Sequence, residues 1–282
     1  MGVRLIASDL DGTLLRNDKS LSEKTVEAIR KAGELGIRFV PSTGRAFEAV
    51  PQNVRELPGV EYVITSNGAA IYSLSQKKRI YECLVPAEAV DELLRISTPE
   101  NMTIEVFIKG VPYTAADHVE DPAKYGATAF GIQYVKRTRH SVDNIREFVA
   151  ENRMCVDSFD FVCGDREMLK AVREEIQKKV PGVYVTSSVS HLLEIGNAAA
   201  GKGKTLLHLL DRLGISKNET IAFGDADNDL DMIQSVKFGI AMGNATEHLK
   251  EAAYHITDSN EDDGVAKEIF RNISIGVAEC DC

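Results

Sequence analysis

The feature that most constrains this chain is a largely apolar segment, residues 3–7, that runs directly into Asp9-Leu10-Asp11-Gly12-Thr13. The segment has the composition of a β-strand that is buried on both faces. Because residues two apart in an extended chain point the same way, Asp9 and Asp11 are expected to face one small volume at the end of this strand. Two carboxylates held so close repel each other unless a cation such as Mg2+ neutralises them. The alternative is that both acids only form a turn before Gly12.

Composition limits the classes of protein to which the chain can belong. At 282 residues it exceeds a typical single domain, and its 44% hydrophobic and 27% charged residues are typical of a globular protein. No apolar run approaches the roughly 20 residues of a membrane span. The start of the chain lacks the charged residues and cleavage site of a signal peptide, so we expect a cytoplasmic protein without a membrane partner. The net charge of −10 argues against nucleic acid as a partner, because phosphate backbones are bound by clustered Lys and Arg.

Strand and helix signals alternate at both ends of the chain, which predicts βαβ units in a parallel sheet. A helix capped by Ser22 and stopped by Gly36 is followed by a strand over 37–40, a helix over 46–56 and a strand over 62–65. The same alternation of strands and helices is expected to resume near Leu192, with strands over 220–223 and 238–241. These elements predict a Rossmann-like core.

The stretch between these two parts has a different pattern. Helices alternate there with strands such as 103–108, in which apolar and polar residues alternate. Alternation predicts a sheet with one covered face and one face in solvent. Residues 117–131 show little periodicity and are expected to form a loop. We therefore predict an α/β core formed by 1–85 and 191–282, with an α/β domain, 86–190, inserted in it.

Small polar residues follow the other predicted core strands. Ser42-Thr43-Gly44-Arg45 follows the second strand, Ser66-Asn67-Gly68 follows the third, and Gly224-Asp225-Ala226-Asp227-Asn228-Asp229 follows the strand over 220–223. In an open α/β sheet the carboxyl ends of the strands form the edge where ligands bind. The acids of the last segment suit a shared divalent ion. For Asp227 and the nearby Asp231, a helix start with solvated acids is the alternative.

Residues 196–205, GNAAAGKGKT, resemble a phosphate-binding P-loop without fitting it. The lysine of that motif is followed by Ser or Thr, whereas Gly203 follows Lys202. If the frame is moved to end at Thr205, Ala198 stands where the first glycine is required. Lys202 still lies between two glycines at the start of a predicted helix, where amide groups and an ammonium together can hold a phosphoryl group. Lys204 is expected on the solvated face of that helix.

In chain order, four motifs are similar to those of the haloacid dehalogenase-like phosphohydrolases. They are Asp9-Leu10-Asp11-Gly12-Thr13-Leu14, Ser42-Thr43-Gly44-Arg45, Lys202-Gly203 and Gly224-Asp225-x-x-Asn228-Asp229. The long insertion, with Ser66-Asn67-Gly68-Ala69 and Ala241-Met242-Gly243-Asn244-Ala245, resembles the Cof-type sugar-phosphatase branch. The resemblance covers essentially the whole chain. It implies a Rossmann-like core with an inserted α/β cap domain that sets substrate specificity over the active site.

The resemblance also implies a role for each motif. Asp9 would be the nucleophile that forms an aspartyl-phosphate, and Asp11 the general acid and base. Mg2+ would be held by Asp9, the backbone carbonyl of Asp11 and Asp225. Asn228 and Asp229 would lie nearby, either as direct ligands or as residues that hold the ligands in place. Thr43, the Gly44 amide and Lys202 would hold the phosphoryl oxygens. Further substrate or phosphate contacts are implied for Arg45, Asn67, Asn228 and Asn244.

These roles predict an Mg2+-dependent phosphatase that acts on a small phosphorylated metabolite, which the branch implies is a sugar phosphate. An acid at Asp11 favours a phosphoryl substrate, because displacing a halide needs no proton. A phosphomutase on the same core is the alternative enzyme, and it would need a bisphosphorylated activator. A non-catalytic regulator that binds Mg2+ or phosphate is disfavoured, because both catalytic acids are present. In the cap, the candidate substrate contacts are polar or aromatic: Lys109, Tyr113, His118, Tyr125 and His191.

Overall fold

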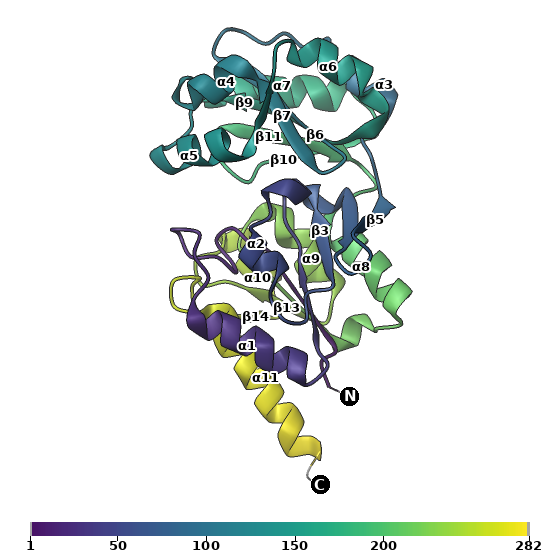
Figure 1. Ribbon diagram of the computed structural model, residues 1–282, viewed down its shortest axis with the longest axis vertical. Helices are drawn as coiled ribbons and strands as arrows, with labels where there is room; N and C mark the ends of the chain where they lie inside the picture. The colour runs from purple at the N-terminus through teal and green to yellow at the C-terminus, as the bar shows by residue number, and fades with distance from the viewer. Residues whose placement is uncertain (1, 281–282) are drawn as a thin grey trace. The chain divides into compact units, whose positions relative to one another are not determined.

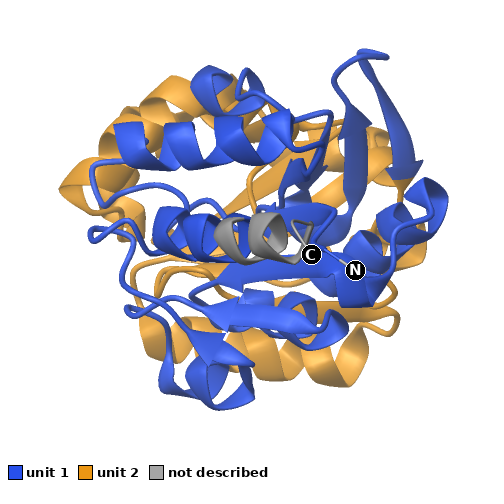
Figure 2. Ribbon diagram, turned by 90° about the horizontal axis from the view of Figure 1, so that it is seen from below, with its two compact units in different colours: residues 1–43, 51–81, 201–282 blue, residues 44–50, 82–200 orange. Residues whose placement is uncertain are grey.

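The computed structural model describes residues 2–280, with side chains through residue 273, and it contains two compact units (Figures 1 and 2). Unit 1 comprises residues 1–43, 51–81 and 201–282, and unit 2 comprises 44–50 and 82–200. The expected fold class, a parallel-sheet core with an inserted α/β domain, is confirmed. The units divide after residues 81 and 200, whereas the sequence placed the divisions after 85 and 190.

Unit 1 is built on a parallel sheet with the strand order β14-β13-β12-β1-β2. β1 lies between β12 and β2, and Ile6 is the register partner of both Ile221 and Phe39. A bridge between Ser42 and Ile64 continues the sheet to β3, which starts the three-stranded sheet β3-β4-β5. The strands are β1 (Leu5–Ser8), β2 (Arg38–Pro41), β3 (Tyr62–Thr65), β4 (Ala70–Ser73), β5 (Lys78–Glu82), β12 (Thr220–Gly224), β13 (Phe238–Ala241) and β14 (His255–Ile256).

The first helix of unit 1, α1 (Glu23–Glu34), follows its local signals closely. The Ser22 side chain accepts a hydrogen bond from the backbone N–H of Thr25 and caps α1, and Gly36 follows the helix end with a φ of 78°. α1 and α11 pack side by side (Figure 1). The helices are α1 (Glu23–Glu34), α2 (Gln52–Arg55), α8 (Lys202–Leu213), α9 (Leu230–Ser235), α10 (Glu247–Ala252) and α11 (Gly264–Cys280). Among the described residues, no helix is both long and apolar enough to cross a membrane.

The expectation of a single helix over 46–56 is wrong. The chain forms a 3-10 turn, η1 (Phe47–Ala49), and then the short helix α2. Pro51 separates the two, and Val50 before it is extended, with φ −72° and ψ 124°. A proline lacks the N–H that a helix interior needs and disfavours helical geometry in the preceding residue.

Unit 2 contains a six-stranded sheet with the order β10-β11-β9-β6-β7-β8. Its apolar core lies between this sheet and helices α3, α6 and α7, and includes Ile104, Val106, Phe159 and Ile176. The strands are β6 (Met102–Ile108), β7 (Val111–Ala115), β8 (His140–Val142), β9 (Val156–Cys163), β10 (Val183–Thr186) and β11 (Leu192–Asn197). The helices are α3 (Ala87–Leu93), α4 (Ala116–Glu120), α5 (Ala129–Thr138), α6 (Ile145–Glu151) and α7 (Arg166–Lys179).

Three sequence-based expectations for this part of the chain are wrong. Residues 117–131 hold α4, the 3-10 turn η3 (Pro122–Tyr125) and the start of α5, all too short to show a helical period. β11 pairs antiparallel with β9 in unit 2, so the parallel pattern resumes only at α8. The polar side of β6 is not in solvent, because all seven of its residues are buried and Arg139 covers Phe107 and Glu105.

Candidate active site

The parallel pairing of β1 with β12 brings two acids to one edge of the unit 1 sheet. Asp9 directly follows β1, and its backbone N–H donates to the Phe223 carbonyl at 3.0 Å. Asp225 directly follows β12. Both strands are buried along their whole length, so the two carboxyl groups lie just beyond the apolar core at the same edge of the sheet. This edge is where the sequence predicted the site.

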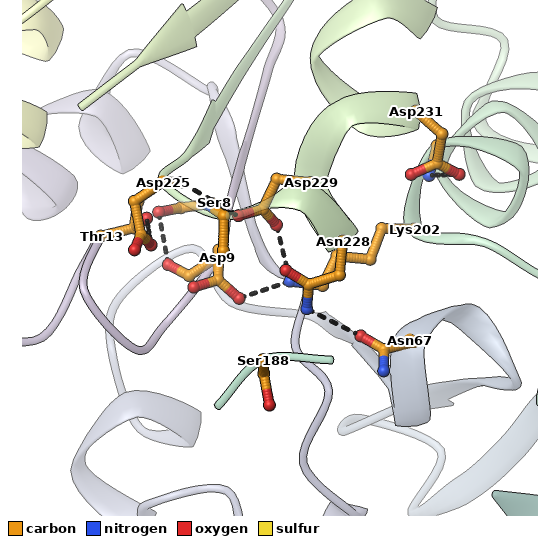
Figure 3. Close-up of polar contacts among 12 residues, drawn as sticks. Ser8, Asp9, Thr13, Asn67, Ser188, Lys202, Asp225, Asn228, Asp229 and Asp231 are labelled. Atoms are coloured by element: carbon orange, nitrogen blue, oxygen red, sulfur yellow. Dashed lines mark hydrogen bonds and ion pairs between the residues drawn. The ribbon is translucent and has the colours of Figure 1, made fainter. Parts of the chain in front are cut away.

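A third carboxyl group joins them from η6 (Asp227–Asp229). Asp9, Asp225 and Asp229 each offer an oxygen within 4.8 Å of the others (Figure 3). The Asp229 Oδ2 accepts hydrogen bonds from the backbone N–H groups of Asp225 (3.0 Å) and Ala226 (3.1 Å), which folds the loop back on itself. A Cβ on Gly224 would lie 2.4 Å from the Cβ of Asp229, so this fold of the loop needs glycine there.

Lys202 lies between two of these acids. Its Nζ is 2.5 Å from Asp9 Oδ1 and 2.6 Å from Asp229 Oδ1, and the side chain is buried (Figure 3). Lys202 is the first residue of α8. Burial lowers the pKa of Lys202, but the charges of Asp229 and Asp9 outweigh it and raise the pKa above its ordinary value. The group is therefore an ammonium at neutral pH.

The carboxyl groups carry more negative charge than one ammonium can balance. Burial raises the pKa of Asp9 well above its usual range against the opposing effect of Lys202, and the charges of Asp229 and Asp225 raise it further. Burial, followed by the charge of Asp229, raises the pKa of Asp225 to about 6. Two buried carboxyl groups that contact one ammonium, with the half-buried carboxyl group of Asp225 beside them, form the oxygen-rich set that Mg2+ prefers. The donors of this cluster therefore fit that ion.

The turn after β1 is held against the cluster by hydrogen bonds. Gly12 has a φ of 84°, and a Cβ there would lie 2.5 Å from Asp225 Oδ2. The Thr13 hydroxyl donates to Asp225 Oδ1 at 2.6 Å. The Asn244 side-chain amide donates to the Gly12 carbonyl at 2.8 Å. The carboxylate of Asp11 forms an ion pair with Lys19, with 2.9 Å between Nζ and Oδ1.

Two further predicted residues meet in the loops after β2 and β3. Thr43 is buried, and its carbonyl accepts a hydrogen bond from the backbone N–H of Asn67 at 3.1 Å. Asn67 adopts a left-handed conformation, φ 50° and ψ 37°, which asparagine tolerates better than most residues. Its side-chain oxygen accepts from Asn228 Nδ2 at 3.1 Å (Figure 3). These contacts join the loops after β2, β3 and β12.

The two predicted residues that follow Thr43 belong to unit 2. The Arg45 guanidinium donates to the Ala49 carbonyl at 3.1 Å and lies 5.0 Å from the centre of the Tyr134 ring. Gly44 begins the same segment of unit 2.

Among the cap candidates, His118 and Tyr125 are buried and lie edge to face, with 5.0 Å between ring centres. Tyr113 packs against Phe148. These three rings contribute to the packing of unit 2.

Sequence reasoning missed the role of Asp231. Its Oδ2 accepts a hydrogen bond from the backbone N–H of Gly203 at 2.9 Å, in the first turn of α8 (Figure 3). The side chain thus caps the helix that carries Lys202, and burial raises its pKa. The only signal in the sequence is the group of acids after β12. For Asp231 the alternative interpretation was a carboxylate exposed to solvent.

Comparison with known proteins agrees with this geometry. A family model described as a haloacid dehalogenase-like hydrolase matches residues 6–269. The chain belongs to this family. The resemblance seen in the sequence motifs, including that to the Cof-type branch, is confirmed, and so is the expectation of a hydrolase.

Relatives of this haloacid dehalogenase-like hydrolase are named as phosphatases. The chain is 29% identical over 275 residues to the 5-amino-6-(5-phospho-D-ribitylamino)uracil phosphatase YitU of Bacillus subtilis. The alignment covers 96% of this chain and 98% of the relative. The chain is 29% identical over 254 residues to the HMP-PP phosphatase of Klebsiella pneumoniae, covering 90% and 89%. A solved haloacid dehalogenase-like hydrolase from Bacteroides thetaiotaomicron superimposes with a TM-score of 0.82 at 30% identity, covering 95% of this chain and 99% of that one.

Proposed function

We propose that the protein is an Mg2+-dependent phosphatase that hydrolyses a small phosphorylated metabolite through an aspartyl-phosphate on Asp9. The convergence of Asp9, Asp225 and Asp229 around the Lys202 ammonium carries this proposal. A buried carboxylate at the end of a strand, beside a cation and further acids, is an arrangement suited to nucleophilic attack on phosphorus. The names of the relatives support the same class of reaction.

In the first step, an oxygen of Asp9 attacks the phosphorus in line with the bond to the leaving group. The new bond joins Asp9 to phosphorus, and the bond from phosphorus to the substrate oxygen breaks. Asp11 donates a proton to that oxygen, so that an alcohol leaves. General acid catalysis of this kind contributes about 10²–10⁴-fold to a rate.

In the second step, a water molecule attacks the phosphorus of the aspartyl-phosphate. Asp11, now a carboxylate, accepts a proton from the water as the new phosphorus–oxygen bond forms. The bond between Asp9 and phosphorus breaks, which releases inorganic phosphate and restores the Asp9 carboxylate. One difficult hydrolysis is thereby divided into two easier displacements.

Positive groups and hydrogen-bond donors are needed to hold the phosphoryl oxygens while the charge on them shifts. We assign this work to Lys202, the Thr43 hydroxyl and the Gly44 amide. Mg2+ would be held by Asp9, the Asp11 carbonyl and Asp225, with Asn228 and Asp229 beside it, and when bound it would shield the nucleophile from the phosphoryl charge. Further contacts to the substrate are proposed for Arg45, Asn67, Asn228 and Asn244.

The substrate proposed here is a sugar phosphate or a similar small phosphate ester, selected by the inserted domain. The relatives support this class, since one is named for a phosphorylated ribitylamino compound. The net charge of −10 supports the absence of nucleic acid as a partner. We also propose a cytoplasmic location.

A phosphate-release assay tests this function. The wild-type protein is incubated with p-nitrophenyl phosphate and a panel of hexose, pentose and triose phosphates, with Mg2+ or with EDTA, beside the variant Asp9→Asn. We expect Mg2+-dependent release that Asp9→Asn abolishes. Conversion of a sugar phosphate to its positional isomer, dependent on an added sugar bisphosphate and without phosphate release, would indicate a phosphomutase. Neither release nor conversion with any ester would indicate a binding protein.

A further inference from the structure

The turn after β1, residues 9–15, is bound by a loop from the other end of unit 1. This loop, residues 257–263, joins β14 to α11. Its residue Asn260 is 6% exposed, and the side-chain amide donates a hydrogen bond to the Leu15 carbonyl at 3.0 Å. The same amide donates to the side-chain oxygen of Asn17 at 3.2 Å. A buried amide that donates to a carbonyl 245 positions away in the chain ties the loop to the end of the β1 turn.

A second link joins the same loop to the start of the turn through Asn244. The backbone N–H of Asn260 donates to Asn244 Oδ1 at 3.0 Å. Asn244 Nδ2 in turn donates to the carbonyl of Gly12 at 2.8 Å. Gly12 directly follows Asp11 in the chain. Asn260 therefore holds the β1 turn at two places, at Leu15 directly and beside Asp11 through Asn244.

Asp11 depends on such contacts more than Asp9 does. Asp9 directly follows β1, and its backbone N–H donates to the Phe223 carbonyl of β12, so the parallel sheet fixes it. Asp11 lies two residues further on, outside the strands of that sheet, and its side chain is 38% exposed. The next residue, Gly12, has a φ of 84°, which takes the chain out of the strand direction. The place of Asp11 is therefore set by the hydrogen bonds of the turn.

The 257–263 loop can hold the turn because its own backbone is fixed. The Ser259 carbonyl accepts hydrogen bonds from the backbone N–H groups of Asp262 at 3.1 Å and Gly264 at 3.0 Å. A Cβ on Gly264 would lie 2.1 Å from the carbonyl oxygen of Asp258, so the tight path of the chain needs glycine there. Asn260 thus donates from a loop with a defined backbone.

We propose that Asn260 is a positioning residue for the transfer of the proton between Asp11 and the leaving oxygen of the substrate. Through Leu15 and Asn244 it holds the β1 turn in the geometry that this transfer needs. A general acid has to lie within hydrogen-bond distance of the atom that it protonates. A displacement of about 1 Å can cost about 10²-fold in rate. The inference rests on the proposed phosphatase function and on the role proposed there for Asp11.

Two aryl phosphates of similar size, phenyl phosphate and p-nitrophenyl phosphate, test the inference. Phenoxide is the poorer leaving group and needs the proton, whereas p-nitrophenoxide leaves without it. The measured quantity is the ratio of kcat/KM for phenyl phosphate to kcat/KM for p-nitrophenyl phosphate. We expect Asp11→Asn to lower this ratio about 10²-fold and Asn260→Ala to lower it about tenfold. A variant that only contains less folded enzyme loses activity with both esters equally and keeps the ratio.

A second variant and a control make the result independent of the folding of Asn260→Ala. Asn244→Ala changes an exposed side chain and removes the hydrogen bond to Gly12, so it should lower the ratio as well. The control is Asn272→Ala on α11, which removes an amide that donates to the Glu268 carbonyl at 2.9 Å in the same unit. This control is expected to keep the ratio of the wild type.

The double variant Asp11→Asn with Asn260→Ala shows whether Asn260 acts through Asp11. We expect it to have the same ratio as Asp11→Asn alone, because the acid that Asn260 positions is already removed. An unchanged ratio in Asn260→Ala and Asn244→Ala, or a further fall of the ratio in the double variant, would overturn the inference and leave the phosphatase function standing. Failure of the wild type to release phosphate from either aryl ester or from any sugar phosphate would remove the proposed function, and this inference with it.

Discussion

The Lys202 ammonium lies 2.5 Å from Oδ1 of Asp9, and both side chains are buried. Lys202 begins a helix that is 193 positions further along the chain than Asp9. Its place depends on the cap that Asp231 provides and on the packing of α8, because the Thr205 hydroxyl donates to the Gly68 carbonyl at 2.7 Å. The proposed nucleophile and the ammonium beside it are thus positioned by separate parts of unit 1.

Lys202→Met should reduce both activity and stability. The change leaves the buried carboxylates of Asp9 and Asp229 without their cation, and breaking a buried ion pair from one side costs about 3–5 kcal/mol. We expect kcat/KM to fall by about 10²-fold or more, as for other groups that stabilise charge in a transition state. Steady-state kinetics and urea unfolding measure the two effects. Lys204→Met, an exposed lysine two residues on, is the control, and an equal loss in that variant would contradict the role given to Lys202.

Gly12→Ala should impair the site more than its backbone strain alone explains. The added Cβ would lie 2.5 Å from Asp225 Oδ2, in addition to the strain at a φ of 84°. Gly36→Ala is the matched control, since its φ is 78° and nothing lies within 4 Å of the added atom. We expect the control to lose about 1 kcal/mol of stability with full activity. Gly12→Ala should lose more stability and most of its activity, and similar results for both variants would argue against contact with Asp225.

The edge of the sheet could be predicted from the sequence because the signal is local. β1 and β12 are apolar runs that end in acids, and parallel strands place their ends together. The capping role of Asp231 could not be predicted, because the N–H that it binds belongs to a helix 28 positions away in the chain. The covered second face of β6 was missed for the same reason, since Arg139 reaches Glu105 from another element. Contacts between segments that are far apart in the chain produce no periodic pattern in the sequence.

The pairing of Glu105 with Arg139 predicts how the stability of unit 2 depends on pH. Burial raises the pKa of Glu105, but the charges of Arg139 and His118 outweigh it and lower the pKa below its usual value. A carboxyl group whose pKa is lower in the folded state contributes stability above its unfolded pKa, about 4.3, and loses it as the pH falls through the folded value. Glu105→Gln should therefore be less stable than the wild type at pH 6. The difference in melting temperature should shrink below about pH 4, and a difference that is independent of pH would contradict this pairing.

Binding of Mg2+ to the three carboxylates should stabilise the fold. A ligand that binds only the native state at about 100 times its Kd adds about 2.7 kcal/mol of stability. We expect the melting temperature of the wild type to rise by several degrees with Mg2+ at constant ionic strength, and the rise to disappear in Asp225→Asn. Asp227→Asn, an exposed acid in the same loop, should keep the rise. The same rise in Asp225→Asn as in the wild type would place the ion elsewhere.

The most direct measurement for the account as a whole is to trap the phosphoryl group on the enzyme. The wild type is mixed with p-nitrophenyl phosphate and Mg2+, denatured during turnover and reduced with borohydride, which converts an aspartyl-phosphate to homoserine. Peptide mass spectrometry then locates the change. We predict homoserine at position 9, only in the presence of substrate, and neither this product nor phosphate release in Asp9→Asn. Phosphate release at the full rate by Asp9→Asn, or reduction at another residue, would contradict the assignment of Asp9 as the nucleophile.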